Sequence, residues 1–275
     1  MCAPEILCLG EVVETWGGKE EARFAGRAVK CPLVPTRVRS LADYVGVLGG
    51  SFASRERLWF RGHGDIFWEL VPSALRYLTE AKRDQALDLL PEFKRVAEIK
   101  QARPPQPDDE LGWHQIAQHF GLPTRLLDWS ENLLIALYFA CEEVDADGMV
   151  FVLNPVALNR LSYPDRPRIL DGRLDEAVIK KYLRLSGRQS KRGLRTVAVN
   201  PVWNSERIML QKGAFTLHGS RDLELPGDTP SLAGIPIPKE SKGALRADLE
   251  RVGIDEMTIF PELEHACRHL RRRVE

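Results

Sequence analysis

The sequence lacks the short motifs that mark several large enzyme classes. It contains no P-loop, no GxGxxG after a strand, no GxSxG elbow, and no CxxC or His-x-Glu metal pattern. These absences argue against ATP hydrolysis, hydride transfer and a structural zinc site, while other hydrolase chemistry stays open. His265 and His269 are four residues apart and could share a metal on one helix face, but the sequence offers no third ligand. We therefore predict a protein without a metal site.

The chain also lacks net charge, because 39 Lys plus Arg residues balance 39 Asp plus Glu residues. A whole-protein basic field of the kind that binds nucleic acid broadly is excluded, although a local basic patch is not. The five cysteines are odd in number and show no metal-ligand spacing, which predicts a reducing compartment without structural disulfides. Apolar runs of membrane-spanning length and a charged-then-apolar leader pattern are absent too. We expect a cytoplasmic protein with no membrane partner.

The 275 residues, 44% of them hydrophobic, can bury a substantial core as one large domain or two small ones. Short predicted strands (57–60, 149–153, 196–199, 214–218) alternate irregularly with predicted helices (81–101, 174–185, 239–251, 260–273). Ser40 and Ser205 are expected to cap two further helices. This order indicates an α+β fold, in which one mixed or antiparallel sheet of short strands is flanked by helices. Strand-like pieces in residues 1–38 predict a small strand-rich extension before a main domain over residues 39–275.

The stretch 119–140, HFGLPTRLLDWSENLLIALYFA, has three parts with different physical properties. Gly121 stands where a left-handed cap would end a helix, and Pro123 prevents that helix from continuing. Residues 122–129 therefore read as a loop, after which Ser130 is expected to cap an almost wholly apolar, buried helix over 131–144. The loop holds Thr124, Arg125 and Asp128 next to the core, where polar groups must be paired or face a ligand.

Several motifs together resemble a known family. Phe60-Arg61-Gly62, LVPSALR at 70–76, GLPTRLLDW at 121–129, QKGAFTLH at 211–218 and GIDEMTIFPEL at 253–263 occur in this order. They are similar to the FRG domain, a bacterial and phage family named for its Phe/Tyr-Arg-Gly motif. The resemblance runs from about residue 40 to the C-terminal residue. The genes that neighbour members of this family suggest a toxin or phage-defence effector that is inhibited by an antitoxin or another regulatory protein.

Arg61 is the first candidate for a functional residue. An arginine at the end of a buried strand, beside Gly62, can direct two N–H groups at a phosphate or carboxylate. The alternative is a structural pair with Asp65, with Asp128 or with a backbone carbonyl.

The 119–128 segment supplies the second group of candidates. Arg125 and Asp128 are three residues apart and can pair if the loop turns helically, so that Asp128 either caps the next helix or orients Arg125 toward a ligand. Thr124 adds a hydroxyl. His119 could donate to the same ligand, or could simply be packed at a helix end.

Gln211 and His218 form the third group, around the predicted strand 214–218. We expect this strand to run beside the Arg61 strand, so that Gln211 can hydrogen-bond a sugar hydroxyl. The alternative is that Gln211 only holds the Gly213 turn. Phe215 and Leu217 should share one face of the strand, and Thr216 and His218 the other.

The order of these segments is similar to that of the arginine-type ADP-ribosyltransferases. Those enzymes have a split mixed sheet of short strands, a strand that ends in Arg-Gly, and a late strand preceded by a catalytic glutamate. Arg61 and Gln211 stand at the corresponding places and are the predicted catalytic residues. The Ser-Thr-Ser strand motif of those enzymes has no clear counterpart here, and Thr124 is at best a loose substitute.

This second resemblance implies NAD as the substrate. Arg61 and Arg125 would supply positive charge to the diphosphate. His119, Thr124, Asp128, Gln211 and His218 would complete the polar wall, and Phe215, Trp129 or Phe120 could stack on nicotinamide. A neutral Gln211 cannot offset developing positive charge, so Glu206 is a possible replacement.

A non-catalytic reading uses the same pocket. The protein would then be a regulatory module that binds a nucleotide, a nucleic-acid end or an acidic partner. Basic segments at 188–195 and 268–273 would contact that partner. Protein and nucleic acid are both open as acceptors of a transferred group.

Overall fold

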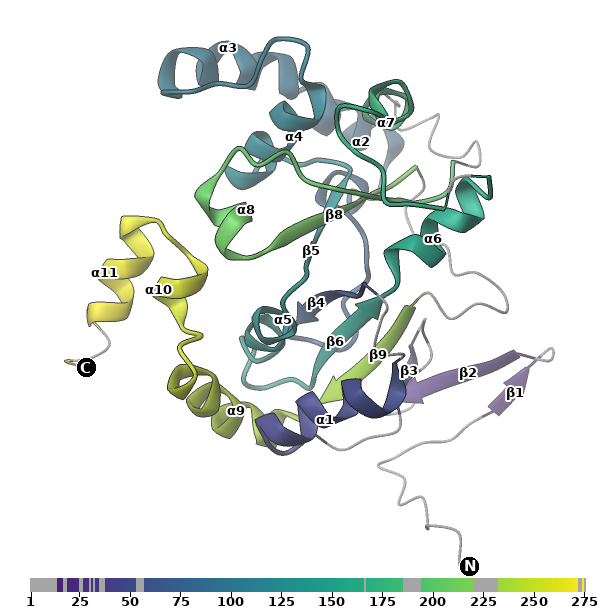
Figure 1. Ribbon diagram of the computed structural model, residues 1–275, viewed down its shortest axis with the longest axis vertical. Coiled ribbons are helices and arrows are strands. Elements are labelled where there is room, and N and C mark those ends of the chain that lie inside the picture. Colours follow the sequence, from purple (N-terminus) through teal and green to yellow (C-terminus); the bar gives the residue numbers. More distant parts are fainter. Residues whose placement is uncertain are drawn as a thin grey trace, which may run out of the picture.

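A six-stranded antiparallel sheet forms the centre of the molecule, and helices lie against it (Figure 1). The computed structural model describes residues 14–16, 19–24, 27–29, 31, 33–34, 38–52, 57–165, 167–184, 194–219, 232–271 and 274. The strand order is β7-β8-β5-β4-β6-β9, and each neighbouring pair is antiparallel. The predicted α+β fold is therefore confirmed. The strands are β4 (Trp59–His63), β5 (Leu126–Ser130), β6 (Gly148–Leu153), β7 (Val197–Val199), β8 (Gly213–Leu217) and β9 (Leu232–Ile237).

The described helices all follow residue 40. They are α1 (Leu41–Ser51), the 3₁₀ turn η1 (Ser73–Leu75), α2 (Glu80–Leu87), α3 (Leu90–Lys100), α4 (Glu110–His119), α5 (Leu133–Ala140), α6 (Pro155–Ser162), α7 (Glu176–Leu183), α8 (Glu206–Leu210), α9 (Lys239–Arg251), α10 (Glu256–Ile259) and α11 (Leu263–Arg271). Side chains cap several of them as the sequence predicts. Ser40 accepts the N–H of Asp43 at the start of α1, and Ser205 accepts that of Ile208 at the start of α8.

The sheet is split between β4 and β5. These two strands share a single register pair, Phe60 with Ser130. Five pairs join β4 to β6, and five join β5 to β8. The two central strands therefore diverge beyond Phe60, and a gap opens in the middle of the sheet.

One face of the sheet carries two groups of helices on either side of this gap. Over β4, β6 and β9, α5 packs with α1 and α9 around Phe60, Val150 and Ile235. Over β5, β8 and β7, α4 and α7 contribute Leu111 and Tyr182 to a second cluster. The opposite face is lined by Trp59, Trp129 and Phe151 and has the third cluster. In Figure 1, α5 lies beside β4 and β6, while α4 and α7 lie near β8.

Gly62 allows α5 to lie directly on β4. A Cβ at this position would overlap the carbonyl oxygen of Ala136, and it would lie 2.6 Å from the backbone nitrogen of Ala140. The sequence placed Gly62 beside Arg61, just after the end of a predicted strand. It is instead inside β4, which continues to His63, so Arg61 is also a mid-strand residue.

Two further predictions about the central stretch were wrong. Residues 126–130 form β5, an interior strand, rather than part of a loop. The apolar alternation of this segment is hidden because Leu126 and Leu127 bury both faces. The cap of α5 is Asn132, which accepts the N–H of Leu134, and Ser130 accepts the N–H of Asn132.

Two further predictions also need correction, one about a helix and one about the place of a strand in the sheet. The predicted helix 81–101 is two helices, α2 and α3, because Pro91 begins a new helix within its first turn. Strand β8 pairs with β5 and β7, so β5 separates it from the Arg61 strand. The last predicted helix, 260–273, is described as α11 over Leu263–Arg271.

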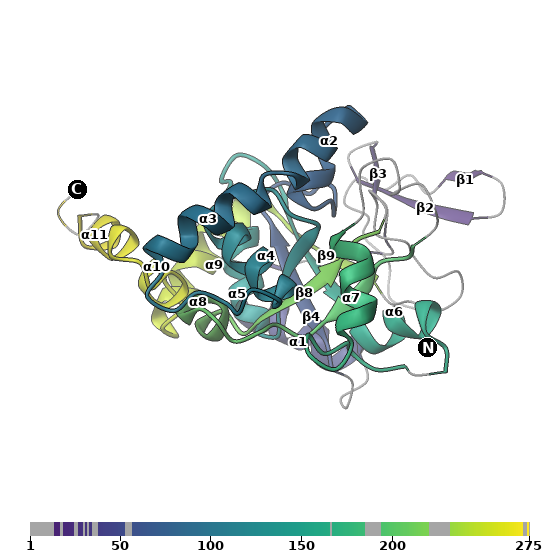
Figure 2. The same cartoon turned by 90° about the horizontal axis from the view of Figure 1, so that it is seen from above.

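Near the N-terminus, β1 (Glu14–Trp16), β2 (Lys19–Phe24) and β3 (Arg27–Val29) form a separate three-stranded antiparallel sheet. It lies at the opposite end of the molecule from α11 (Figure 2). Residues 1–13 of the predicted strand-rich extension fall outside the described residues, as does most of the basic segment 188–195. The domain boundary after residue 38 stays a prediction.

Candidate functional site

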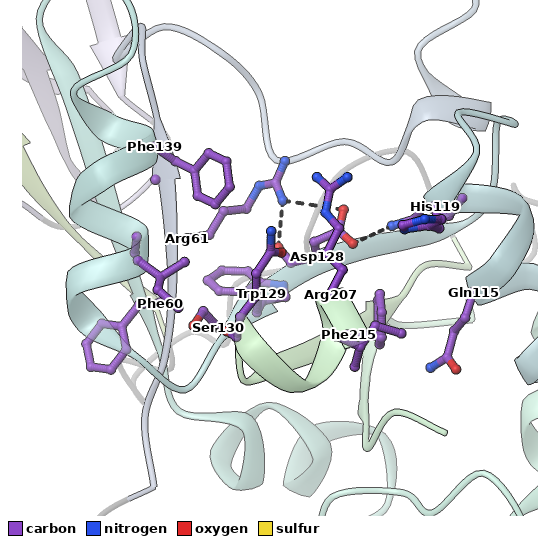
Figure 3. A pocket seen from close by; sticks show the side chains of 16 residues that line it. Phe60, Arg61, Gln115, His119, Asp128, Trp129, Ser130, Phe139, Arg207 and Phe215 are labelled. Atoms are coloured by element: carbon purple, nitrogen blue, oxygen red, sulfur yellow. Dashed lines mark hydrogen bonds and ion pairs between the residues drawn. The ribbon is translucent and has the colours of Figure 1, made fainter. Parts of the chain in front are cut away.

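A cavity of about 250 Å³ lies where the sheet splits. Strands β4 and β5, helices α4, α5 and α8, and the start of β8 form its wall (Figure 3). The wall combines polar and aromatic side chains, among them Phe60, Arg61, Gln115, Gln118, His119, Asp128, Trp129, Ser130, Phe139, Arg207, Gln211 and Phe215. Five predicted site residues, Arg61, His119, Asp128, Gln211 and Phe215, thus meet in one place.

Arg61 reaches this cavity through the gap in the sheet. Its Nη1 donates to the backbone oxygen of Asp128 at 2.6 Å, where a regular ladder would have strand-to-strand bonds. The carboxylate of Asp128 is 3.9 Å from the same nitrogen. Burial lowers the pKa of Arg61 to about 10, and the charge of Asp128 opposes that shift. The guanidinium is therefore still a cation at neutral pH, with 18% of the side chain exposed.

His63 holds the other side of the Arg61 guanidinium. Nε of Arg61 donates to Nε2 of His63 at 2.9 Å, so the histidine proton is placed on Nδ1, which lies 3.2 Å from the oxygen of Trp68. Burial lowers the pKa of His63 well below its ordinary value, and the positive charge of Arg61 adds to this effect. A neutral His63 fixes the orientation of Arg61.

Asp128 is the carboxylate in the cavity wall. Its Oδ1 accepts a hydrogen bond from Nε2 of Gln118 at 2.7 Å. Gln118 in turn accepts a hydrogen bond from the hydroxyl of Thr124. Thr124 is thus a support for Gln118 and Asp128, and it does not itself line the cavity.

Gln211 lines the cavity, but its amide nitrogen is already engaged. Nε2 donates to the backbone oxygen of Ile259 at 3.1 Å, which ties α8 to α10. Its backbone oxygen accepts the Ser130 hydroxyl at 2.6 Å. The amide oxygen is the part of Gln211 that a ligand could use. Glu206, its suggested replacement, is exposed and lies outside the cavity wall.

His119 and Phe215 complete the predicted part of the wall. Nε2 of His119 lies 3.6 Å from a carboxylate oxygen of Glu262. Burial lowers the pKa of His119, and nearby Arg207 lowers it further, while Glu262 opposes both. Trp129 is also in the wall, whereas the exposed Phe120 is not.

Arg125 and His218 do not belong to this cavity, which corrects the prediction that they do. Residues 125, 127 and 129 alternate with Asp128 along β5, so Arg125 has its side chain on the opposite face. It is fully buried and donates to the backbone oxygen of His218 at 3.2 Å. Burial lowers the pKa of Arg125 to about 10 and that of His218 to about 3.

The sequence interpretation missed Arg207, Gln115 and Gln118. Helical spacing was the available signal: Arg207 is four residues before Gln211 on a helix that Ser205 marks, and Gln115 is four before His119. Ser130 was assigned to a cap and not to the pocket. These residues share a wall because three non-adjacent elements converge, which no local pattern reports.

A second hollow of about 850 Å³ is lined by residues that include Trp203, Met209 and Lys212. None of the predicted site residues lines it, and Arg57 in its wall is bonded to Glu131. Within the described ranges, no group of three or more His, Cys, Asp or Glu side chains is placed to hold a metal ion. His265 instead lies 3.0 Å from a carboxylate oxygen of Glu256. No described helix is both long and apolar enough to cross a membrane.

These features define an α+β protein with a polar pocket at a split in its central sheet. Residues 56–148 match the FRG domain, so the chain contains an FRG domain. The matched range includes Arg61 and Asp128, but the QKGAFTLH and GIDEMTIFPEL motifs lie beyond it. No curated protein and no solved structure matches this chain.

Proposed function

We propose that the pocket binds NAD and transfers its ADP-ribosyl group to an acceptor. The observation that carries this proposal is the convergence of Arg61, the Asp128–Ser130 strand end and Gln211 on one cavity. These segments are far apart in sequence and occur in the order expected from the transferase resemblance. The split between β4 and β5 is further support, because a split sheet of short strands is part of that resemblance.

The reaction breaks the bond between nicotinamide and ribose C1. Nicotinamide leaves with the bonding electrons, and an acceptor nucleophile then bonds to C1 and loses a proton. Positive charge develops on the ribose in between, so a fixed negative group nearby lowers the barrier. Asp128 is better suited to this role than neutral Gln211, which would orient a ribose hydroxyl through its amide oxygen.

Arg61 would bind a phosphate of NAD. A guanidinium that is held by His63 and by the Asp128 backbone oxygen does not need to be ordered when the ligand arrives. Phe139 and Phe215 supply aromatic surface for the nicotinamide ring.

The test uses NAD carrying a label in its adenylate part, incubated with the protein and a bacterial lysate. We expect label on protein or nucleic acid with the wild type, and loss of roughly 100-fold or more in turnover with Arg61→Ala and with Asp128→Asn. Gln211→Ala should lose less. Arg57→Ala is the matched control, because its ion pair with Glu131 lies outside this cavity. Undiminished labelling by Arg61→Ala would refute the assignment.

A regulatory module that binds a nucleotide or an acidic partner is the second candidate. It is favoured by the engagement of the Gln211 amide with Ile259, which commits part of the proposed catalytic machinery to structure. NAD binding without consumption would select this reading. NAD consumption without transfer would indicate a glycohydrolase, and no NAD binding at millimolar ligand would remove both enzymatic readings.

The same activity would suit a toxin or phage-defence effector acting in the cytoplasm. Expression of the wild type should then slow bacterial growth, and Arg61→Ala should not. Co-expression of an antitoxin or another regulatory protein would restore growth with the wild type.

A further inference from the structure

Arg207 is a second guanidinium in the cavity wall, and within the described residues its side chain makes no hydrogen bond. Its Cζ lies 4.7 Å from the ring centroid of Phe260, and its Nη1 lies 3.9 Å from a carboxylate oxygen of Glu262. About a third of the side chain, 31%, is exposed. The stacking orients the guanidinium plane, while the N–H groups at its edge stay available to a ligand.

Four arginines of the described surface differ from Arg207. Each donates a hydrogen bond to a neighbouring carboxylate: Arg57 to Glu131, Arg168 to Asp175, Arg184 to Glu110, and Arg251 to Asp248. A guanidinium matches the geometry of phosphate through two parallel N–H donors. Arg207 keeps this capacity, and it faces the same cavity as Arg61.

We propose that Arg207 is a phosphate-binding residue, and that it and Arg61 together bind the diphosphate of a dinucleotide. This inference rests on the proposed function, since it concerns the same pocket. The two guanidinium groups come from β4 and α8, on different sides of the cavity, so each can take one phosphate.

The charges around the cavity support a ligand with more than one negative charge. Asp128 is 3.9 Å from Arg61 and its Oδ1 is bonded to Gln118, and Glu262 is 3.9 Å from Arg207. Neither carboxylate hydrogen-bonds the arginine that it faces. The positive charges are therefore only partly compensated, and a phosphate at hydrogen-bonding distance would interact more strongly than either carboxylate does.

Calorimetry with three ligands separates this proposal from the proposed function. NAD contains adenosine, the diphosphate and nicotinamide riboside, ADP contains adenosine and the diphosphate without nicotinamide, and nicotinamide riboside contains no phosphate. For Arg207→Gln we expect about tenfold weaker binding of NAD and of ADP, equivalent to about 1.4 kcal/mol, and unchanged binding of nicotinamide riboside. Arg207→Lys keeps the charge but loses the two-pronged geometry, so its affinities should fall between those of the wild type and Arg207→Gln.

Arg251→Gln is the control, because it removes an exposed arginine that is bonded to Asp248 outside the cavity. Thermal unfolding of each variant checks that the fold is intact. If the wild type binds ADP with dependence on Arg207 but does not bind NAD, the proposed function fails and the phosphate site stands. Equal ADP affinity in wild type and Arg207→Gln, equal losses for nicotinamide riboside, or no ADP binding at all would overturn the inference.

Discussion

The polar side chains on the two faces of strand β5 lie in different surroundings. Arg125, on one face, is fully buried and donates to the His218 backbone. Asp128, on the other face, lines an open cavity with Arg61. Burial lowers the pKa of Arg61 and of Arg125 alike to about 10, so desolvation alone does not distinguish a binding arginine from a structural one. The distinguishing property is whether a cavity lies beside the guanidinium.

The largest effect should come from Arg125→Ala, which tests the face of β5 on which Arg125 is fully buried (the sealed face). We expect a loss of about 4 kcal/mol in the free energy of unfolding, because the change leaves a cavity and an unpaired buried carbonyl. Urea denaturation measures it. Arg61→Ala should cost only about 1 kcal/mol, and Arg57→Ala, a half-exposed surface pair, less than about 1 kcal/mol. Equal losses for Arg61→Ala and Arg125→Ala would erase the contrast between the two faces.

Gly62→Ala tests the packing beneath the open pocket. The added Cβ would overlap Ala136 and lie 2.9 Å from Phe139 Cβ, so α5 must move away from β4. We expect a loss of about 2 kcal/mol in stability and weaker ligand binding, because Ala136 and Phe139 also line the cavity. Gly243→Ala in α9 is the control: nothing lies within 4 Å of the place that its added methyl group would take, so it should stabilise by roughly 0.5–1 kcal/mol. Unchanged stability of Gly62→Ala in denaturation would contradict the close approach.

Measuring the free energy of unfolding as a function of pH tests the histidines that are buried in the fold. Burial lowers the pKa of His114 to about 4 and that of His218 to about 3, and His63 is also shifted well down. In the unfolded chain these groups have a pKa of about 6.5, so the unfolded state binds more protons below that pH. Stability should therefore fall as the pH decreases from about 6.5 toward 4, by about 1.4 kcal/mol per pH unit for each histidine that stays neutral in the fold.

His218→Gln should reduce this slope by the contribution of one histidine. Urea denaturation of both proteins at matched pH values gives the comparison. Parallel slopes for wild type and variant would mean that His218 is not held neutral on the sealed face.

The smallest effect is expected for Gln118→Met, which removes the hydrogen-bonded link between Thr124 and Asp128. Gln118 accepts from Thr124 and donates to Asp128, so the variant loses both bonds. We expect a stability loss of about 1 kcal/mol and a change in NAD turnover of less than about tenfold. A larger effect on turnover than that of Asp128→Asn would show that Gln118 contacts the substrate itself.

Local chemistry in the sequence predicted many element boundaries well. Ser40 and Ser205 cap helices as expected. The apolar run at 149–153 is an interior strand. Phe215 and Leu217 share one face of β8, as their alternation predicts. Each of these features depends on residues within a few positions of one another.

The errors arose where tertiary contacts decide. Leu126 to Ser130 is a strand because β8 and β4 lie on either side of it, and Pro123 made the segment resemble a loop. The side chains along β5 alternate between the two faces of the sheet, and the sequence did not predict this strand. Asp128 was therefore grouped correctly with Arg61 and Gln211 in one pocket, whereas Arg125 and His218, which lie on the other face, were wrongly added to it.

The single register pair between Phe60 and Ser130 has a mechanical consequence. With so few bonds across its middle, the sheet consists of two three-stranded leaves, β7-β8-β5 and β4-β6-β9, joined at one point. A dinucleotide that binds both Arg61 on one leaf and Arg207 beside the other would hold the two leaves together. Amide protons along β4 and β5 would then exchange more slowly with solvent when the ligand is bound.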